Sequence, residues 1–193
     1  RYLSTLKKQG WQTYGIEQSP KSSKYARDVL QLEVNTGDLL DCKYQAEFFD
    51  VITMWHSLEH LYEPILTLKE AKRILKDDGL LIITVPNVNS FAAKVFKKYW
   101  YQLEIPIHLI AFTPDSITRM LDVAGLKAKR IYYDRRNSPL KQSLLNLKDG
   151  KYRLLSKLSR FKVLIRMFNF ILAMLGSCEI IVIYAQKKTS YDV

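Results

Sequence analysis

The feature that most constrains the fold is an alternation of short apolar runs with amphipathic helical patterns. Leu80 to Val85 is a run of six apolar or β-branched residues, typical of a strand that is covered on both faces. Helical patterns begin at Pro20, Pro64 and Pro114, where a proline at the first helical position costs no hydrogen bond. The alternation predicts an α/β fold with a mostly parallel sheet and right-handed crossovers.

The expected elements follow from periodicity and from glycine and proline positions. Asp77 to Gly79 is expected to form the turn that closes the helix begun at Pro64. Residues 86–106 are irregular and aromatic-rich, which favours a lid over a ligand, with an extra packed helix as the alternative. We expect strands over residues 11–16, 32–36, 51–55, 80–85, 126–133 and 179–186, and helices over 1–10, 19–30, 64–75 and 113–125.

Polar side chains follow directly after the apolar run from Val51 to Trp55, which we interpret as a buried strand. His56, Ser57, Glu59 and His60 come next in the chain. Ligands of open α/β sheets bind outside the carboxyl ends of the strands, so this stretch is expected to form a site.

Two more acids, Glu17 and Asp38, stand just beyond other expected strands. A carboxylate in such a place is either a solvated surface group or an acceptor for ribose hydroxyls. The residues alone leave both interpretations open for Glu17.

Length and composition favour one domain in a reducing compartment. The chain has 193 residues, and its two cysteines, Cys42 and Cys178, have no metal-type spacing. The first ten residues have a helical rather than a secretory pattern, and no apolar run approaches the ~20 residues that span a bilayer. We therefore expect a cytoplasmic protein, with peripheral membrane contact left open.

The positive charge is concentrated in one segment. The net charge is +11, and residues 135–166 hold ten basic residues against one acid, Asp149. We expect residues 135–176 to be a basic helical insertion before the last strand. Nucleic acid is disfavoured as a partner because the basic residues are interleaved with an apolar stripe. That stripe consists of Leu154, Leu158, Phe161, Ile165, Phe168, Leu172 and Leu175.

This stripe has two interpretations. It is the buried face of a helix that packs on its own domain or on a partner in a homodimer. Alternatively, the helix lies in a membrane interface and is attracted by anionic lipid. Lys162 and Arg166 argue against a helix that spans the membrane.

Several short motifs occur together in a specific order. They are Gly15-Ile16-Glu17 before Ser19-Pro20, Gly37-Asp38-Leu39, Phe49-Asp50-Val51-Ile52, Leu58-Glu59-His60-Leu61, Ile74-Leu75-Lys76 with Gly79-Leu80, Val85-Pro86-Asn87, and the block from Pro106-Ile107-His108 to Phe112-Thr113-Pro114. In this order they resemble class I S-adenosylmethionine-dependent methyltransferases, and most closely the branch that includes the ubiquinone-pathway O-methyltransferases. The resemblance covers residues 1–133 in register and the final strand.

The resemblance implies a Rossmann-like three-layer sandwich with seven strands, of which the last two form an antiparallel hairpin. It implies S-adenosylmethionine as cofactor and a small-molecule or lipid-like methyl acceptor. It also implies cofactor-binding roles: Glu17 at the ribose hydroxyls with Gln18 beside it, Asp38 and Leu39 at the adenine, and Trp55, His56 and Ser57 at the sulfonium end.

One departure from the family concerns its first strand and glycine-rich turn. In the family both precede the helix that begins here at Arg1, and the turn lets the backbone approach the cofactor. We therefore expect either an N-terminally truncated domain or a domain in which another segment or another chain fills the gap. In either case we expect weak or no cofactor binding by this chain, and whether it is inactive in this form stays open.

Methyl transfer to a hydroxyl needs a base, and histidine is suited to that role. His60 and His108 are the candidate catalytic residues, and no metal site is assigned. A divalent ion held by Glu59 and His60, as in the nearest branch, remains open.

Two other functions compete with methyl transfer. The main alternative is a noncatalytic module that binds a partner or a membrane through the basic helix. A nicotinamide-dependent dehydrogenase ranks lower because it does not explain the Leu58-Glu59-His60 motif.

Overall fold

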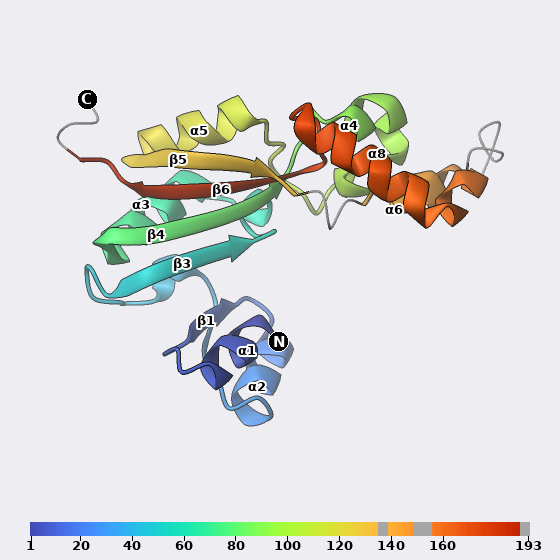
Figure 1. Ribbon diagram of the computed structural model, residues 1–193. Coiled ribbons are helices and arrows are strands. Elements are labelled where there is room, and N and C mark those ends of the chain that lie inside the picture. Colours follow the sequence, from blue (N-terminus) through green and yellow to red (C-terminus); the bar gives the residue numbers. More distant parts are fainter. Residues whose placement is uncertain (135–138, 149–155, 190–193) are drawn as a thin grey trace. The chain divides into compact units, whose positions relative to one another are not determined.

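The computed structural model describes residues 1–134, 139–148 and 156–189, which form two compact units, Arg1–Gln45 and Ala46–Val193 (Figure 1). The expected insertion at 135–176 therefore lies partly outside the described residues, and so does Leu154.

The first unit is a small α/β element with two parallel strands. Its β1 and β2 pair in parallel, with Glu17 opposite Thr36. Helix α2 begins at Pro20 because the Ser19 hydroxyl accepts a hydrogen bond from the Ser22 amide at 3.3 Å. The elements are α1 (Tyr2–Lys8), β1 (Tyr14–Glu17), α2 (Pro20–Asp28), β2 (Glu33–Thr36) and η1 (Leu39–Asp41).

The second unit contains a mixed four-stranded sheet in the order β3-β4-β6-β5. Strands β3 and β4 are parallel, and β6 runs antiparallel to both of its neighbours, β4 and β5. The expected α/β fold with a final antiparallel pair is confirmed. The strands are β3 (Phe49–Trp55), β4 (Leu75–Pro86), β5 (Leu126–Tyr133) and β6 (Ile180–Lys187).

Two helices cover one face of this sheet. Helix α3 (Pro64–Ile74) packs on β4, α5 (Pro114–Val123) packs on β5, and the two helices contact each other. The start of α5 is fixed by a reciprocal capping box between Thr113 and Ser116. The fully buried core residues that join these layers include Leu68, Ala71, Leu81, Ile83, Ile117, Leu121, Ile181 and Ile183.

Two details of this sheet differ from expectation. The run at Val51 to Trp55 is not a buried strand: only Met54 is buried, because β3 stands at an end of the four-stranded sheet. Residues 76–79 are part of β4 and do not form a turn, because the buried Leu75 already pairs with Phe49. The register then shifts so that Val51 pairs with Leu80.

The remaining helices form a helical lobe beyond the carboxyl ends of β4 and β5 (Figure 1). The helical lobe consists of α4 (Phe91–Phe96), η3 (Lys97–Tyr99), η4 (Tyr101–Leu103), α6 (Leu140–Leu145), η5 (Asn146–Lys148), η6 (Lys157–Arg160) and α8 (Lys162–Met174).

This lobe has a core of its own. The buried side chains that form it are Ala92, Phe96, Trp100, Leu140, Leu144 and Leu147. Residues 86–106 therefore include helices that are packed on the domain, and the irregular lid was the wrong alternative. The indole Nε1 of Trp100 donates to Glu179 Oε2 at 2.7 Å, which ties the lobe to the residue before β6.

The apolar stripe is not the buried face of one continuous helix. Residues 157–160 form a 3-10 turn, and α8 begins only at Lys162. Leu172 is buried, whereas Leu158, Phe161 and Leu175 are exposed.

The Trp100 bond is expected to stabilise the unit. Replacing Trp100 by Phe keeps most of the apolar volume but removes one donor from a buried carboxylate. We expect the free energy of unfolding to fall by about 1–3 kcal/mol in urea titrations. The control is Trp11→Phe, since Trp11 is 52% exposed and its replacement should change stability by less than about 0.5 kcal/mol. Equal unfolding midpoints for the two variants would contradict this role.

The two cysteines should differ in reactivity. Burial raises the pKa of the Cys178 thiol to about 11, with a smaller contribution from the nearby Glu179 carboxylate. At pH 8 its thiolate fraction is then only about one in a thousand, and the fraction rises with pH toward 11. We expect iodoacetamide at pH 8 to label the half-buried Cys42 first and Cys178 only after unfolding, as read by peptide mass spectrometry. Labelling of both at the same rate in the folded protein would refute this.

Candidate functional site

The site begins where β3 ends. Trp55 is paired with Thr84 of β4, and the next amide, that of His56, donates to the Thr84 carbonyl at 3.0 Å. His56 has a φ of 47°, in the left-handed region that few residues other than glycine adopt. This backbone geometry turns the chain out of the sheet and into η2 (Leu58–His60). Strained backbone of this kind is concentrated at functional sites.

Glu59 is fully buried, which is rare for a carboxylate. Its Oε1 lies 3.1 Å from His56 Nδ1. Its Oε2 is buried and has no hydrogen-bond partner among the residues that the structure describes. A buried polar atom without a partner is costly, so this oxygen points to an interaction with a bound group.

The two candidate catalytic histidines lie side by side. The ring centroids of His60 and His108 are 4.8 Å apart. His60 Nδ1 is 3.1 Å from the Ile107 carbonyl, and His108 Nδ1 is 2.9 Å from the Gln102 carbonyl. Because a carbonyl only accepts, each Nδ1 donates to it, and Nε2 is the ring nitrogen that is left for other partners.

Main-chain bonds bring these histidines together from distant parts of the sequence. The carbonyl of Glu59 accepts from the amides of Leu109 and Ile110, at 2.9 and 3.2 Å. Farther along, the Val88 amide after β4 donates to the Phe112 carbonyl at 2.9 Å. These bonds hold the segment that carries His108 against η2.

The charged neighbour of the pair is Glu104, whose Oε2 is 3.5 Å from His108 Nε2. Glu104 was not among the residues predicted from the sequence, although it stands four residues before His108 on the same loop. Glu59 was predicted to lie in the stretch that forms the site, but its only suggested role was that of a metal ligand. Its adjacency to His60 in the Leu58-Glu59-His60 motif was the available signal, but its burial was not visible in the sequence.

The site also contains the ligand atoms that a divalent cation needs, from Glu59, His60 and His108. Each offers one ligand atom, and these atoms all lie within 4.8 Å of one another. Carboxylate and imidazole are common ligands of first-row metal ions. The arrangement therefore has the donors for either proton transfer or metal binding.

The predicted adenosine-binding residues belong to the first unit. Glu17 Oε1 accepts from the Ser19 amide at 2.9 Å, so the carboxylate is held at the start of α2. Gln18 Nε2 donates to Asp38 Oδ1 at 2.7 Å, which brings these two predicted residues together. Leu39 follows as the first residue of η1.

The other predicted cofactor-binding residues, Trp55, His56 and Ser57, belong to the second unit. Trp55 is 46% exposed, and His56 and Ser57 are half-buried.

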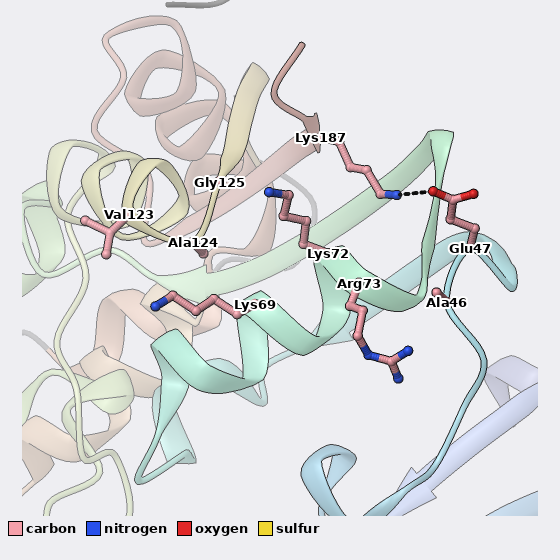
Figure 2. Close-up of a pocket in the computed structure, with 9 residues that line it drawn as sticks. All are labelled: Ala46, Glu47, Lys69, Lys72, Arg73, Val123, Ala124, Gly125 and Lys187. Atoms are coloured by element: carbon pink, nitrogen blue, oxygen red, sulfur yellow. Dashed lines mark hydrogen bonds and ion pairs between the residues drawn. The ribbon is translucent and has the colours of Figure 1, made fainter. Parts of the chain in front are cut away.

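A hollow of about 560 Å³ lies elsewhere on the second unit, near the amino ends of β3 and β5 (Figure 2). It is mainly basic, and Lys187 in its wall already bonds Glu47 at 3.3 Å. The histidine pair therefore does not line this hollow, whose lining residues are Ala46, Glu47, Lys69, Lys72, Arg73, Val123, Ala124, Gly125 and Lys187.

Comparison with known proteins gives the family. A sequence model described as a methyltransferase domain matches residues 1–130. No curated protein matches the sequence.

Solved structures show the same fold. An S-adenosylmethionine-dependent methyltransferase of Thermotoga maritima, a possible histamine N-methyltransferase, superimposes with a TM-score of 0.65 and 20% identity, covering 97% of this chain and 76% of its own. A second such methyltransferase, from Archaeoglobus fulgidus, gives a TM-score of 0.63 at 17% identity, with coverage of 96% and 80%. A geranyl diphosphate methyltransferase has a TM-score of 0.59 at 11% identity, and the match covers 93% of this chain and 70% of that protein.

These relatives agree with the Rossmann-like α/β architecture, in which a site forms at the carboxyl ends of the strands. S-adenosylmethionine is the cofactor that this fold and family imply. The chain therefore belongs to the methyltransferase domain family, and it shares its fold with S-adenosylmethionine-dependent methyltransferases.

Proposed function

We propose that the protein is an S-adenosylmethionine-dependent O-methyltransferase of the branch that includes the ubiquinone-pathway enzymes, with a small or lipid-like acceptor. The observation that carries this proposal is the His60–His108 pair beside the buried Glu59, at the end of β3. A hydroxyl acceptor must lose a proton during methyl transfer, and this pair supplies bases for it.

The cofactor-binding roles rest on residue chemistry. Bound S-adenosylmethionine would supply a methyl group that is bonded to its sulfonium sulfur. The carboxylate of Glu17 would accept charge-assisted hydrogen bonds from the ribose diol. Gln18, Asp38 and Leu39 would surround the adenine, and the Gln18–Asp38 bond fixes two of these side chains. Trp55, His56 and Ser57 would line the methyl-donating end.

The acid–base roles follow from the geometry of the pair. The carbonyls of Ile107 and Gln102 hold the two Nδ1 atoms, so an Nε2 atom takes the proton of the acceptor hydroxyl. Glu104, 3.5 Å from His108 Nε2, then stabilises the imidazolium that forms. The buried Oε2 of Glu59, which has no hydrogen-bond partner among the described residues, would accept a hydrogen bond from the acceptor hydroxyl.

Apolar side chains next to the histidines support a lipid-like acceptor. Ile105 and Ile107 are 74% and 63% exposed, and Leu109 is 44% exposed on the same loop as His108. Exposed apolar residues that gather at a site are typical of surfaces that bind apolar groups. The similarity to a geranyl diphosphate methyltransferase supports the same class of acceptor.

A noncatalytic module that binds a partner or a membrane is the second candidate. The observation that favours it is the exposed apolar surface of α8. Calorimetry of the chain with S-adenosylhomocysteine separates the two functions. Binding supports the enzyme, and no binding favours the module.

Glu17 is expected to control cofactor affinity. Hydrogen bonds to a charged group contribute about 1.5–3 kcal/mol, so Glu17→Gln should raise the Kd for S-adenosylhomocysteine roughly tenfold or more. The measurement is isothermal titration calorimetry. Glu33→Gln is the matched control, because Glu33 is an exposed acid on β2 and is expected to leave the Kd unchanged. Equal affinities of the two variants would remove Glu17 from the site.

The histidine pair is expected to control turnover. His60→Gln and His108→Gln should each lower kcat by about 10²–10⁴-fold, which is the usual contribution of a general base. The assay measures S-adenosylhomocysteine released in the presence of simple phenols and prenylated phenols. The control is Tyr62→Phe, since Tyr62 is 88% exposed and two residues from His60.

Unchanged kcat in both histidine variants would reject the base role. Metal analysis of the purified protein tests the other possible role of these residues, which is metal binding. A stoichiometric ion that disappears in His60→Gln would make these residues metal ligands instead.

A further inference from the structure

The helical lobe carries an apolar surface that methyl transfer does not explain. Six apolar side chains of α8 and of its C-cap residue, Leu175, are between 51% and 75% exposed, namely Val163, Leu164, Met167, Ile171, Met174 and Leu175. They recur at spacings of three and four residues, so they lie along one side of the helix. Solvent-exposed apolar surface of this extent marks a site of interaction.

The opposite side of α8 is already used for packing. Asn169 and Leu172 are buried, and Ile165 packs against the core of the lobe. Phe168 meets Phe91 of α4 with ring centroids 5.4 Å apart. The exposed side is therefore additional to the face that holds the helix on the protein.

The charge of the lobe indicates the chemistry of the partner. The described parts of the lobe, residues 91–103, 139–148 and 156–176, contain no acid, and every helix of the lobe except η4 contains a basic residue. Such a surface is complementary to an anionic one. The exposed basic residues are Lys94, Lys97, Lys98, Lys141, Lys157, Arg160 and Arg166.

We propose that the exposed side of α8 docks the protein on an anionic lipid surface. Amphipathic helices that lie in the headgroup region combine these two features, an apolar side and basic residues around it. The described residues contain no helix that is long and apolar enough to cross a membrane. In this arrangement α8, which has 13 residues, lies in the interface with its exposed apolar side toward the lipid, and the exposed Arg166 of the same helix reaches the headgroups.

Charge and apolar contact make separate contributions that vesicles can distinguish. A basic residue near an anionic bilayer strengthens binding about fivefold, whereas a neutral bilayer provides only the apolar contribution. The protein should therefore bind vesicles of equal parts phosphatidylcholine and phosphatidylglycerol at least about tenfold more tightly than vesicles of phosphatidylcholine alone.

The test is co-sedimentation of the full chain with these two vesicle types. The variant V163S/M167S/M174S should weaken binding to anionic vesicles by about tenfold or more, because apolar area no longer enters the interface. All three positions are more than half exposed, so circular dichroism should show an unchanged fold.

The matched control is V29S/L66S/V123S, which replaces side chains of 59%, 48% and 61% exposure at the C-cap of α2 and in α3 and α5, and which should leave vesicle binding unchanged. Failure of the unaltered chain to bind anionic vesicles would overturn the proposal. Equal binding by the α8 variant would also overturn it. So would a homodimer in solution that the α8 changes dissociate, because a second copy would then cover this surface.

Discussion

The pairing of β4 on both of its edges is the constraint on which the second unit depends. Its parallel bonds to β3 and antiparallel bonds to β6 satisfy the main chain of a strand whose Leu81, Ile83 and Val85 are fully buried. Burial of these side chains then fixes where α3 and α5 pack. Since β3 ends opposite Thr84, the same pairing sets the point at which the chain leaves the sheet for Glu59 and His60.

The parts of the fold that the sequence predicted are those with strong local signals. The apolar run at 80–85, the helix start at Thr113-Pro114 and the strand at 126–133 are all encoded within a few residues. The predicted turn at Asp77 to Gly79 was wrong for the opposite reason. The turn-like composition of these residues was overridden by the pairing of Leu75 with Phe49, which lies far away in the sequence.

The candidate site shows the same division between local and distant information. The order of residues predicted that polar side chains follow β3, and it also predicted His60 and His108 as candidate catalytic residues. It could not predict that the two histidines are in contact. Their contact depends on main-chain bonds from Leu109 and Ile110 to the Glu59 carbonyl, some 50 residues earlier. The sequence also could not predict that one side of α8 is exposed, because an apolar stripe has the same residue pattern whether or not other side chains cover it.

The helical lobe is built from two excursions of the chain, one between β4 and α5 and one between β5 and β6. Both leave and re-enter the domain near the carboxyl ends of the strands (Figure 1). Insertions or deletions in either excursion change the lobe without breaking a strand pair. During evolution, the surface around the site is therefore free to diversify while the sheet stays the same, which allows one scaffold to serve different acceptors and different cellular surfaces.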